Sequence, residues 1–172
     1  MGYISVPNRK PIPDINNLIE KYGNSLLRMC LIYLKDSHLA EDAVQDTFIK
    51  IHKSYPKFRG DSKERTWIMR IAINVCKNYL RSSWWKRIDE TMVLENMPSN
   101  NSNDALQDEA LLLEIMKLSS KYKEVILLFY YQDMKIREIA EVLKTPEATI
   151  SIRLKRAREI LKINLKGWYY DE

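Results

Sequence analysis

The chain has 172 residues, of which 45% are apolar, with only 4 glycines and 6 prolines. This is enough to bury the core of one medium domain or of two small ones, and the long stretches with few breakers predict an all-α protein. The net charge of +5 is compatible with a polyanionic partner. We find no apolar run near the roughly 18 residues of a membrane helix and no secretion signal, so we expect a cytoplasmic protein without direct membrane insertion.

Charge is distributed unevenly along the sequence. Residues 64–87 hold six basic residues and one acidic residue, residues 135–166 hold nine basic and four acidic residues, and residues 88–114 hold seven acidic and no basic residues. Two basic blocks around an acidic connector are typical of two nucleic-acid contacts joined by a linker. Cys30 and Cys76 have neither metal nor redox spacing, so buried, reduced thiols are expected.

The first half of the chain reads as an arm followed by a helical domain over residues 14–87. Residues 1–13 contain three prolines and predict a flexible N-terminal arm. A long helix begins after its cap, Asp14, and ends near Leu34. A second helix, with Ser37 as its expected cap, runs to Pro56.

The outward face of this second helix is acidic and carries one apolar residue. It presents the side chains of Asp42, Gln45, Asp46 and Ile49. A solvated face with one stray isoleucine is common in proteins, and the pattern alone favours that interpretation. The alternative is a docking surface for a basic partner.

A short loop after Pro56 combines cations with an aromatic residue; it consists of Lys57, Phe58, Arg59, Gly60 and Asp61. Charge for a phosphate and a flat face for stacking suit a single-stranded or flipped base, although Phe58 can equally fill the core. Ser62 is the expected cap of a third helix that runs to about Trp85. One side of that helix presents Asn74, Lys77 and Asn78, which suit base edges and phosphates.

The composition then changes to that of a linker. Residues 88–103 predict an acidic flexible linker, and residues 104–172 predict a second helical domain. Within it, Ser120 is an expected helix cap. Residues 134–161 read as two helices around a tight turn, with Thr145 as the expected cap of the second.

The last of these helices has an apolar face and a basic face. A helix of this kind fits the major groove of DNA, with Arg153, Lys155 and Arg156 facing phosphates and bases. Two ordinary helices with a solvated basic face give the same pattern, so both interpretations stay open at this point.

Four stretches, taken together and in order, carry a family resemblance. They are HLAEDAVQDTF at 38–48, FRGDS at 58–62 with Thr66 and Trp67, RIAIN at 70–74 with KNYL at 77–80, and IAEVL at 139–143 through RAR at 156–158. Over residues 14–166 the chain resembles the extracytoplasmic-function (ECF) sigma factors of bacterial RNA polymerase. The resemblance implies an all-α protein of two small helical domains, the second of them a helix-turn-helix domain.

The resemblance also implies roles for individual residues. The positions that match contacts to core RNA polymerase, at the clamp helices of its β′ subunit, are Asp42, Gln45, Asp46 and Ile49. The positions that match recognition of the melted −10 element are Lys57, Phe58, Arg59, Gly60, Asp61, Ser62, Asn74, Lys77 and Asn78. The positions that match recognition of the −35 duplex are Ser151, Ile152, Arg153, Lys155 and Arg156. In the recognition helix Ser151 and Ile152 replace a pair that is usually basic or polar in the family, and Ile152 suits a thymine methyl group.

The expected partners are therefore core RNA polymerase, including its β flap, promoter DNA and an anti-sigma factor, which in this family is often membrane-bound. We expect no enzymatic activity, no catalytic residues, no cofactor and no metal ion, because His38 and His52 have no evident catalytic partners. The alternative function is a stand-alone helix-turn-helix transcriptional regulator. That alternative leaves the 57–87 block without a role.

Overall fold

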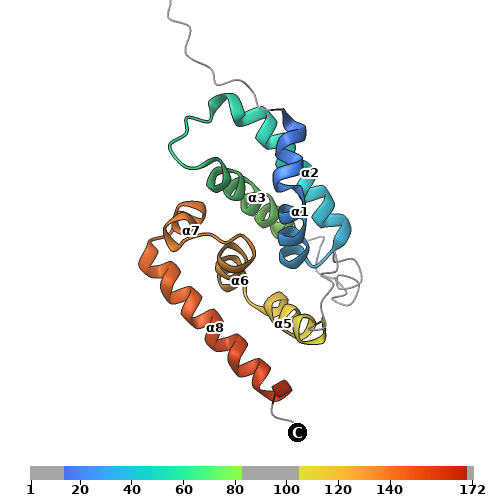
Figure 1. Cartoon of the computed structure of the whole chain (residues 1–172), viewed down its shortest axis with the longest axis vertical. Coiled ribbons are helices and arrows are strands. Elements are labelled where there is room, and N and C mark those ends of the chain that lie inside the picture. The colour runs from blue at the N-terminus through green and yellow to red at the C-terminus, as the bar shows by residue number, and fades with distance from the viewer. Residues whose placement is uncertain (1–13, 83–104, 170–172) are drawn as a thin grey trace, which may run out of the picture.

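The computed structural model describes residues 14–82 and 105–169, and every regular element in these two ranges is helical (Figure 1). This confirms the predicted all-α fold class. The expected N-terminal arm over 1–13, the linker over 88–103 and the Trp84–Trp85 pair lie outside the described residues, so the proposed domain limits stay predictions. Among the described helices, none is long and apolar enough to cross a membrane.

The first half of the chain is a three-helix unit. It contains α1 (Ile15–Leu34), α2 (Ser37–Ser54), the short 3-10 helix η1 (Tyr55–Lys57) and α3 (Glu64–Arg81). Helix α1 packs on α2, and α2 packs on α3. Helices α2 and α3 each bury one apolar stripe, as their 3.6-residue periodicity requires, whereas α1 is buried on all sides from Met29 to Leu34.

The residue that caps α1 is the one predicted from the sequence, whereas the residues at the cap positions of α2 and α3 are not. The Asp14 carboxylate accepts the backbone N–H of Asn16 at 3.0 Å. Helix α2 is capped by Asp36, whose Oδ1 accepts the N–H of Leu39 at 2.8 Å, and Ser37 is its first residue. A carboxylate is favoured here because it faces the positive end of the helix dipole. Helix α3 begins at Glu64 with Lys63 in the cap position, so Ser62 is not its cap.

The second half contains α5 (Ala105–Lys117), α6 (Ser120–Ile126), the π-helical segment η3 (Leu127–Tyr131), α7 (Ile136–Leu143) and α8 (Glu147–Tyr169). The cap position of α6 is Ser119, and the expected cap Ser120 is its first residue. The predicted turn between α7 and α8 is present, with Lys144 in the left-handed region at φ 50°. The Thr145 hydroxyl donates to the carbonyl of Leu143 at 3.1 Å.

The two halves pack directly against each other. Helix α3 lies against α7, and α1 contacts α5 and α6 (Figure 1). Their buried apolar side chains form a single cluster that includes Leu26 and Met69 from the first half and Ile126 and Ile139 from the second. Apolar side chains at the boundary are therefore buried by residues of both halves.

A carboxylate at the start of α3 ties the first half together. Glu64 accepts the hydroxyl of Tyr22 at 3.1 Å and that of Tyr55 at 2.9 Å, and its Oε1 lies 3.4 Å from Nζ of Lys21. Burial raises the pKa of Glu64, but the two tyrosine hydrogen bonds and the lysine charge outweigh it and hold the pKa below its usual value. One side chain thereby joins α1, η1 and α3.

We predict that Glu64→Ala lowers the free energy of unfolding by about 1–3 kcal/mol, because two buried tyrosine hydroxyls lose their acceptor. Urea denaturation at neutral pH measures this. The effect should shrink below about pH 4, since a carboxyl with a depressed pKa stabilises the fold only while it is ionised. The control is Glu20→Ala, an exposed change on α1 that should cost less than about 0.5 kcal/mol. Equal losses for the two variants would contradict the prediction.

Candidate nucleic-acid and protein interfaces

The acidic face of α2 is assembled as the sequence predicts. Asp42, Gln45, Asp46 and Ile49 follow the i, i+3, i+4, i+7 spacing that places residues on one side of a helix. Asp42 and Gln45 are exposed, and 49% of Ile49 is exposed. The opposite side of the helix supplies buried residues such as Phe48 and Ile51. This face therefore combines charged and polar groups with one exposed apolar side chain.

Helix α3 holds one of these acidic side chains in place. The Tyr79 hydroxyl donates to Oδ2 of Asp46 at 2.8 Å. Burial, followed by the hydrogen bond and the negative charge of Asp46, raises the pKa of Tyr79 to about 12. This hydrogen bond fixes the orientation of the Asp46 side chain.

The loop after α2 anchors its aromatic residue inward. The half-buried Phe58 ring stacks on Trp67 with centroids 4.8 Å apart, and it lies 5.8 Å from the Tyr55 ring. Gly60 has φ 79°, a conformation that L side chains rarely adopt. The loop therefore exposes Lys57, Arg59 and Asp61 rather than the full face of Phe58, while Ser62 is half-buried.

The three polar residues expected on α3 have different surroundings. Asn74 and Asn78 are exposed. Lys77 lies between them on the same side of the helix, and its Nζ is 3.4 Å from Oε1 of Glu124 on α6. The second half of the chain therefore reaches this face of α3.

The basic face of α8 is open. Ile150, Leu154, Ala157 and Leu161 are buried and fix the helix against α6 and α7. On the opposite side Ile152, 53% exposed, lies beside the exposed Lys155 and Arg156. Ser151 and Arg153 flank this surface, Arg153 being partly buried.

Hydrogen bonds close both ends of α7. Glu138 accepts the backbone N–H of Lys135 at 2.9 Å at the start of α7, and the N–H of Thr145 donates to the carbonyl of Ala140 at 3.1 Å at its end. A helix-turn-helix that presents a basic helix has the geometry of a major-groove reader.

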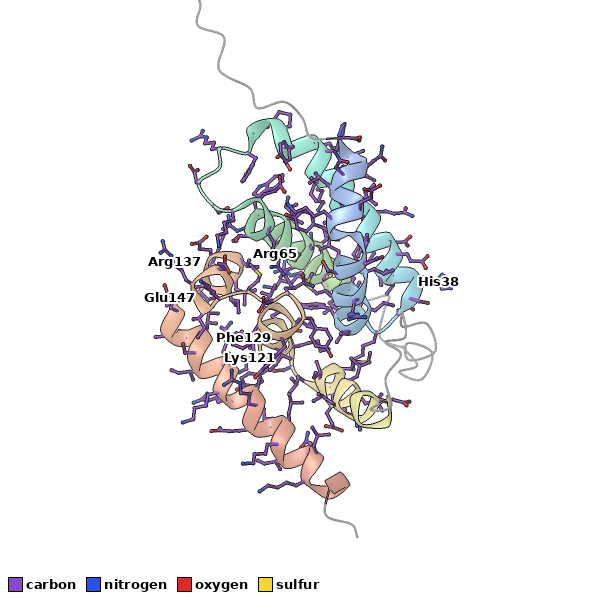
Figure 2. The ribbon with its side chains drawn as sticks, viewed as in Figure 1. His38, Arg65, Lys121, Phe129, Arg137 and Glu147 are labelled. Carbon is purple, nitrogen blue, oxygen red and sulfur yellow. The ribbon has the colours of Figure 1, made fainter. Side chains whose placement is uncertain are left out.

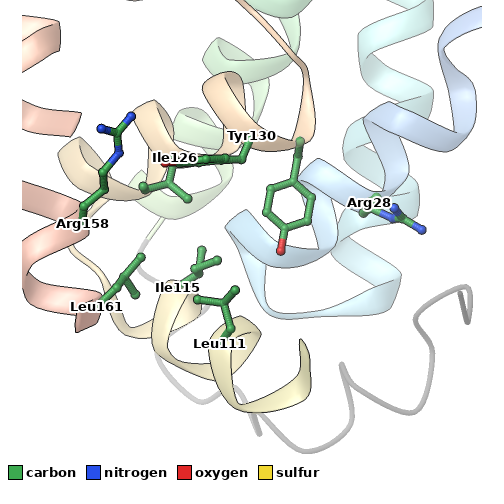
Figure 3. Close-up of a pocket in the computed structure, with 8 residues that line it drawn as sticks. Arg28, Leu111, Ile115, Ile126, Tyr130, Arg158 and Leu161 are labelled. Atoms are coloured by element: carbon green, nitrogen blue, oxygen red, sulfur yellow. The ribbon is translucent and has the colours of Figure 1, made fainter. Parts of the chain in front are cut away.

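An apolar pocket of about 530 Å³ lies where α1, α5, α6, η3 and α8 meet (Figure 3). Leu111 and Ile115 point into it from α5, and Leu161 enters from α8. Arg28 and Arg158 lie at its two ends. The Arg158 guanidinium stacks over the Tyr130 ring at 5.6 Å. Nothing in the sequence singled out this pocket, because its lining comes from five separate elements, Ile126 of α6 included.

Sequence reasoning also missed residues that support these surfaces. The sequence predicts no supporting role for Tyr79, which holds Asp46, or for Trp67, which stacks on Phe58. Glu124 had no expected role. Their partners lie between 9 and 47 positions away, so no local motif reveals them. Within residues 14–82 and 105–169 we find no group of three potential metal ligands.

We predict that Asp46→Asn lowers the pKa of Tyr79 from about 12 towards its usual value near 10, because the negative charge that disfavours the phenolate is removed. NMR of ring-labelled tyrosine at about pH 10.5 measures the ionised fraction. Asp42→Asn is the matched control and should produce a smaller change, since Asp42 acts on Tyr79 only through its charge. An unchanged Tyr79 signal in Asp46→Asn would contradict the contact.

Comparison with known proteins identifies two family regions in this chain. The family model for sigma-70 region 2 matches residues 18–86, and the model for sigma-70 region 4 matches residues 108–161. The chain is 29% identical over 158 residues to the RNA polymerase sigma-H factor of Pseudomonas aeruginosa, which covers 84% of this chain and 82% of that protein. It is also 29% identical over 161 residues to the ECF RNA polymerase sigma-E factor of Haemophilus influenzae, covering 86% of this chain and 85% of that protein.

A solved structure supports the fold. The sigma factor RpoE of Bartonella quintana, determined in complex with the anti-sigma factor NepR, superposes with a TM-score of 0.72 at 21% identity. The match covers 92% of this chain and 99% of that one. The region 2 match contains α2 and α3, and the region 4 match contains the turn between α7 and α8. The chain belongs to the ECF sigma factors of the sigma-70 family.

Proposed function

We propose that this chain binds core RNA polymerase and directs promoter-specific initiation of transcription by reading −35 duplex DNA and melted −10 DNA. The observation that supports this most is the presence of two different kinds of surface in one chain. An acidic, partly apolar helix face suits a protein partner, and a basic helix-turn-helix face suits duplex DNA. A stand-alone regulator has no need of the first surface.

The exposed face of α2 is the proposed contact with core polymerase. Ile49 supplies apolar area, and Asp42, Gln45 and Asp46 supply charge and hydrogen bonds for a basic surface such as the β′ clamp helices. Because Tyr79 holds Asp46, this face is preorganised. The contact with the β flap follows from the family resemblance alone.

DNA is read at two places in this proposal. Helix α8 enters the major groove of the −35 element, where Lys155 and Arg156 bind phosphates or guanines and Ile152 contacts a thymine methyl. The 57–62 loop and the Asn74–Asn78 side of α3 hold the melted −10 strand. Each stacked base contributes about 1–3 kcal/mol, which offsets part of the cost of opening the duplex.

The protein acts by binding rather than by catalysis, and its place of action is the cytoplasm, where the polymerase and the promoter are found. No step of the proposed function breaks or forms a covalent bond on the chain. Melting of DNA follows from the preferential binding of the unpaired strand.

We predict that the chain, added to bacterial core polymerase and a fragment library of its host DNA, yields discrete run-off transcripts that core alone does not make. Asp42→Lys/Asp46→Lys should abolish these transcripts, because a basic partner is then repelled. The matched control Glu20→Lys/Glu109→Lys makes the same change in net charge at exposed positions away from this face and should retain them.

Thermal unfolding checks that the variants are folded, and Asp42→Lys alone, which leaves the Tyr79–Asp46 contact intact, should reduce transcription at least tenfold. Absence of transcripts, together with tight sequence-specific duplex binding by the chain alone, would favour the stand-alone regulator instead. An adaptor that binds only protein would keep its function after loss of Arg153 and Arg156.

An anti-sigma factor is the further proposed partner, since the RpoE protein of Bartonella quintana was solved with one. We predict that the tagged chain purified from resting cells carries a stoichiometric protein inhibitor, and that removing this inhibitor increases run-off transcription. Transcription by the isolated chain and by the co-purified material are compared at equal concentrations. A chain recovered without a partner and already fully active would contradict this.

A further inference from the structure

The two cysteines of the chain lie side by side in the core of the first half. Cys30 of α1 and Cys76 of α3 are 46 positions apart in the sequence, yet their sulfur atoms are only 3.5 Å apart. Both side chains are completely buried, in the interior where side chains of α1 and α3 meet (Figure 2). The tertiary structure has therefore made a pair of adjacent thiols that the sequence spacing does not reveal.

The direction of the contact makes the two thiols unequal. The Cys76 thiol donates to the sulfur of Cys30, so a thiolate on Cys30 has a hydrogen-bond donor beside it. This hydrogen bond, followed by burial and with a contribution from the negative charge of Glu124, raises the pKa of the Cys76 thiol. The thiolate is the form that reacts with an oxidant. The arrangement therefore favours Cys30 as the first thiol to react and Cys76 as its partner.

Two sulfurs placed in this way suit a disulfide better than a metal ion. A disulfide bond is about 2.05 Å long, so the sulfurs need to approach each other by about 1.5 Å, which rotation about the Cα–Cβ bonds can supply. A structural zinc ion takes four ligands. Within residues 14–82 and 105–169 no group of three potential metal ligands forms around these thiols or elsewhere.

Burial sets the conditions under which such a bond forms. In the cytoplasm, the proposed place of action, glutathione and thioredoxin keep thiols reduced, so the resting state is the dithiol. Neither sulfur is accessible to solvent, and an oxidant reaches them only when α1 and α3 part locally. A molecule as small as hydrogen peroxide enters a brief opening more readily than a bulky thiol reagent does.

We propose that Cys30 and Cys76 are a modification site, at which hydrogen peroxide forms a reversible intramolecular disulfide between α1 and α3. In the first step the Cys30 thiolate attacks peroxide. A sulfur–oxygen bond forms, the oxygen–oxygen bond breaks, and the released hydroxide takes up a proton to become water. The Cys76 sulfur then attacks the sulfenic acid of Cys30, so that the disulfide forms and the sulfur–oxygen bond breaks. A second water leaves with the proton of the Cys76 thiol, and one peroxide has been reduced to two waters.

The disulfide holds α3 on α1 and leaves the outward faces of both helices as they are. Cys76 is on the core side of α3, whereas Asn74 and Asn78 are exposed. The segment between the two cysteines contains α2 and the 57–62 loop, and closing it removes conformational entropy from the unfolded chain. The oxidised chain is therefore the more stable form. This inference does not rest on the proposed function, and its tests involve neither polymerase nor DNA.

The disulfide is tested first by counting thiols, because the chain contains just two cysteines. The full chain is treated with hydrogen peroxide while folded, then denatured and titrated with Ellman's reagent. We expect both thiols to disappear while the chain stays monomeric and loses the mass of two hydrogen atoms. Its digest should contain a peptide pair joined through Cys30 and Cys76, which dithiothreitol separates. Retention of both thiols, oxidation to separate sulfinic acids or a disulfide-linked dimer would overturn the proposal.

Thermal unfolding tests whether the disulfide belongs to the native fold. The oxidised chain should unfold about 5–15 °C higher than the same chain after treatment with dithiothreitol, because the cross-link stabilises a fold that already holds the two sulfurs together. A disulfide that forms only in unfolded molecules strains the helices. An equal or lower unfolding temperature of the oxidised chain would therefore overturn the proposal.

Single variants test the order of the two steps. Cys76→Ala leaves Cys30 without its partner thiol, so the sulfenic acid of Cys30 should accumulate and be trapped by dimedone. Cys30→Ala is the matched control, since it removes the same atoms from the same core, and it should be labelled about fivefold more slowly or less. Equal labelling would overturn the assignment of Cys30 as the first thiol. The unfolding temperature of each variant shows that it is folded, and the thiol count on the unmodified chain needs no variant.

Discussion

The arrangement of the molecule depends on a buried carboxylate. Glu124 is nearly inaccessible, so its charge must be met by donors within the protein. Tyr33 and Lys77 supply them from α1 and α3, and both belong to the other half of the chain. The same charge, after the hydrogen bond to Cys30 and burial, helps raise the pKa of the Cys76 thiol, whose sulfur lies 3.5 Å from that of Cys30. One side chain therefore links α6 to the centre of the first half.

The surfaces proposed for binding are the helix faces that this packing does not use. Helix α8 buries Ile150, Leu154 and Ala157 and so turns its cations outward. Helix α2 buries Phe48 and Ile51 and exposes Ile49 with its acidic neighbours. In a helix with 3.6 residues per turn, the residues that face the core determine which residues face outward. The position of the apolar stripe on each helix therefore also fixes its proposed binding face.

Helix α3 differs because the second half of the chain also contacts it. Its apolar side packs on α1 and α2, while its other side meets α7 and, through Lys77, Glu124 of α6. Among the described residues, Nε of Arg70 and Oε1 of Gln132 are buried there without a hydrogen-bond partner. The two halves are nevertheless joined by one continuous apolar cluster. In the loop after α2, Phe58 stacks on Trp67 and so anchors the loop, while the charged residues of the loop stay exposed to solvent.

Much of this protein was determined by the sequence alone. Helical periodicity, scarce glycine and proline, and turn residues are local properties, so they predicted the all-α class, the helix-turn-helix and the exposed faces of α2 and α8. The caps were predicted less well, since Asp36 rather than Ser37 accepts the backbone N–H of Leu39 at the start of α2. Only the tertiary structure decided which charges meet. Glu124 pairs with Lys77, Tyr79 with Asp46, and Lys63 with Glu138, across 33 to 75 positions. Such pairs depend on how helices cross, and the period of a single helix carries no information about its neighbour.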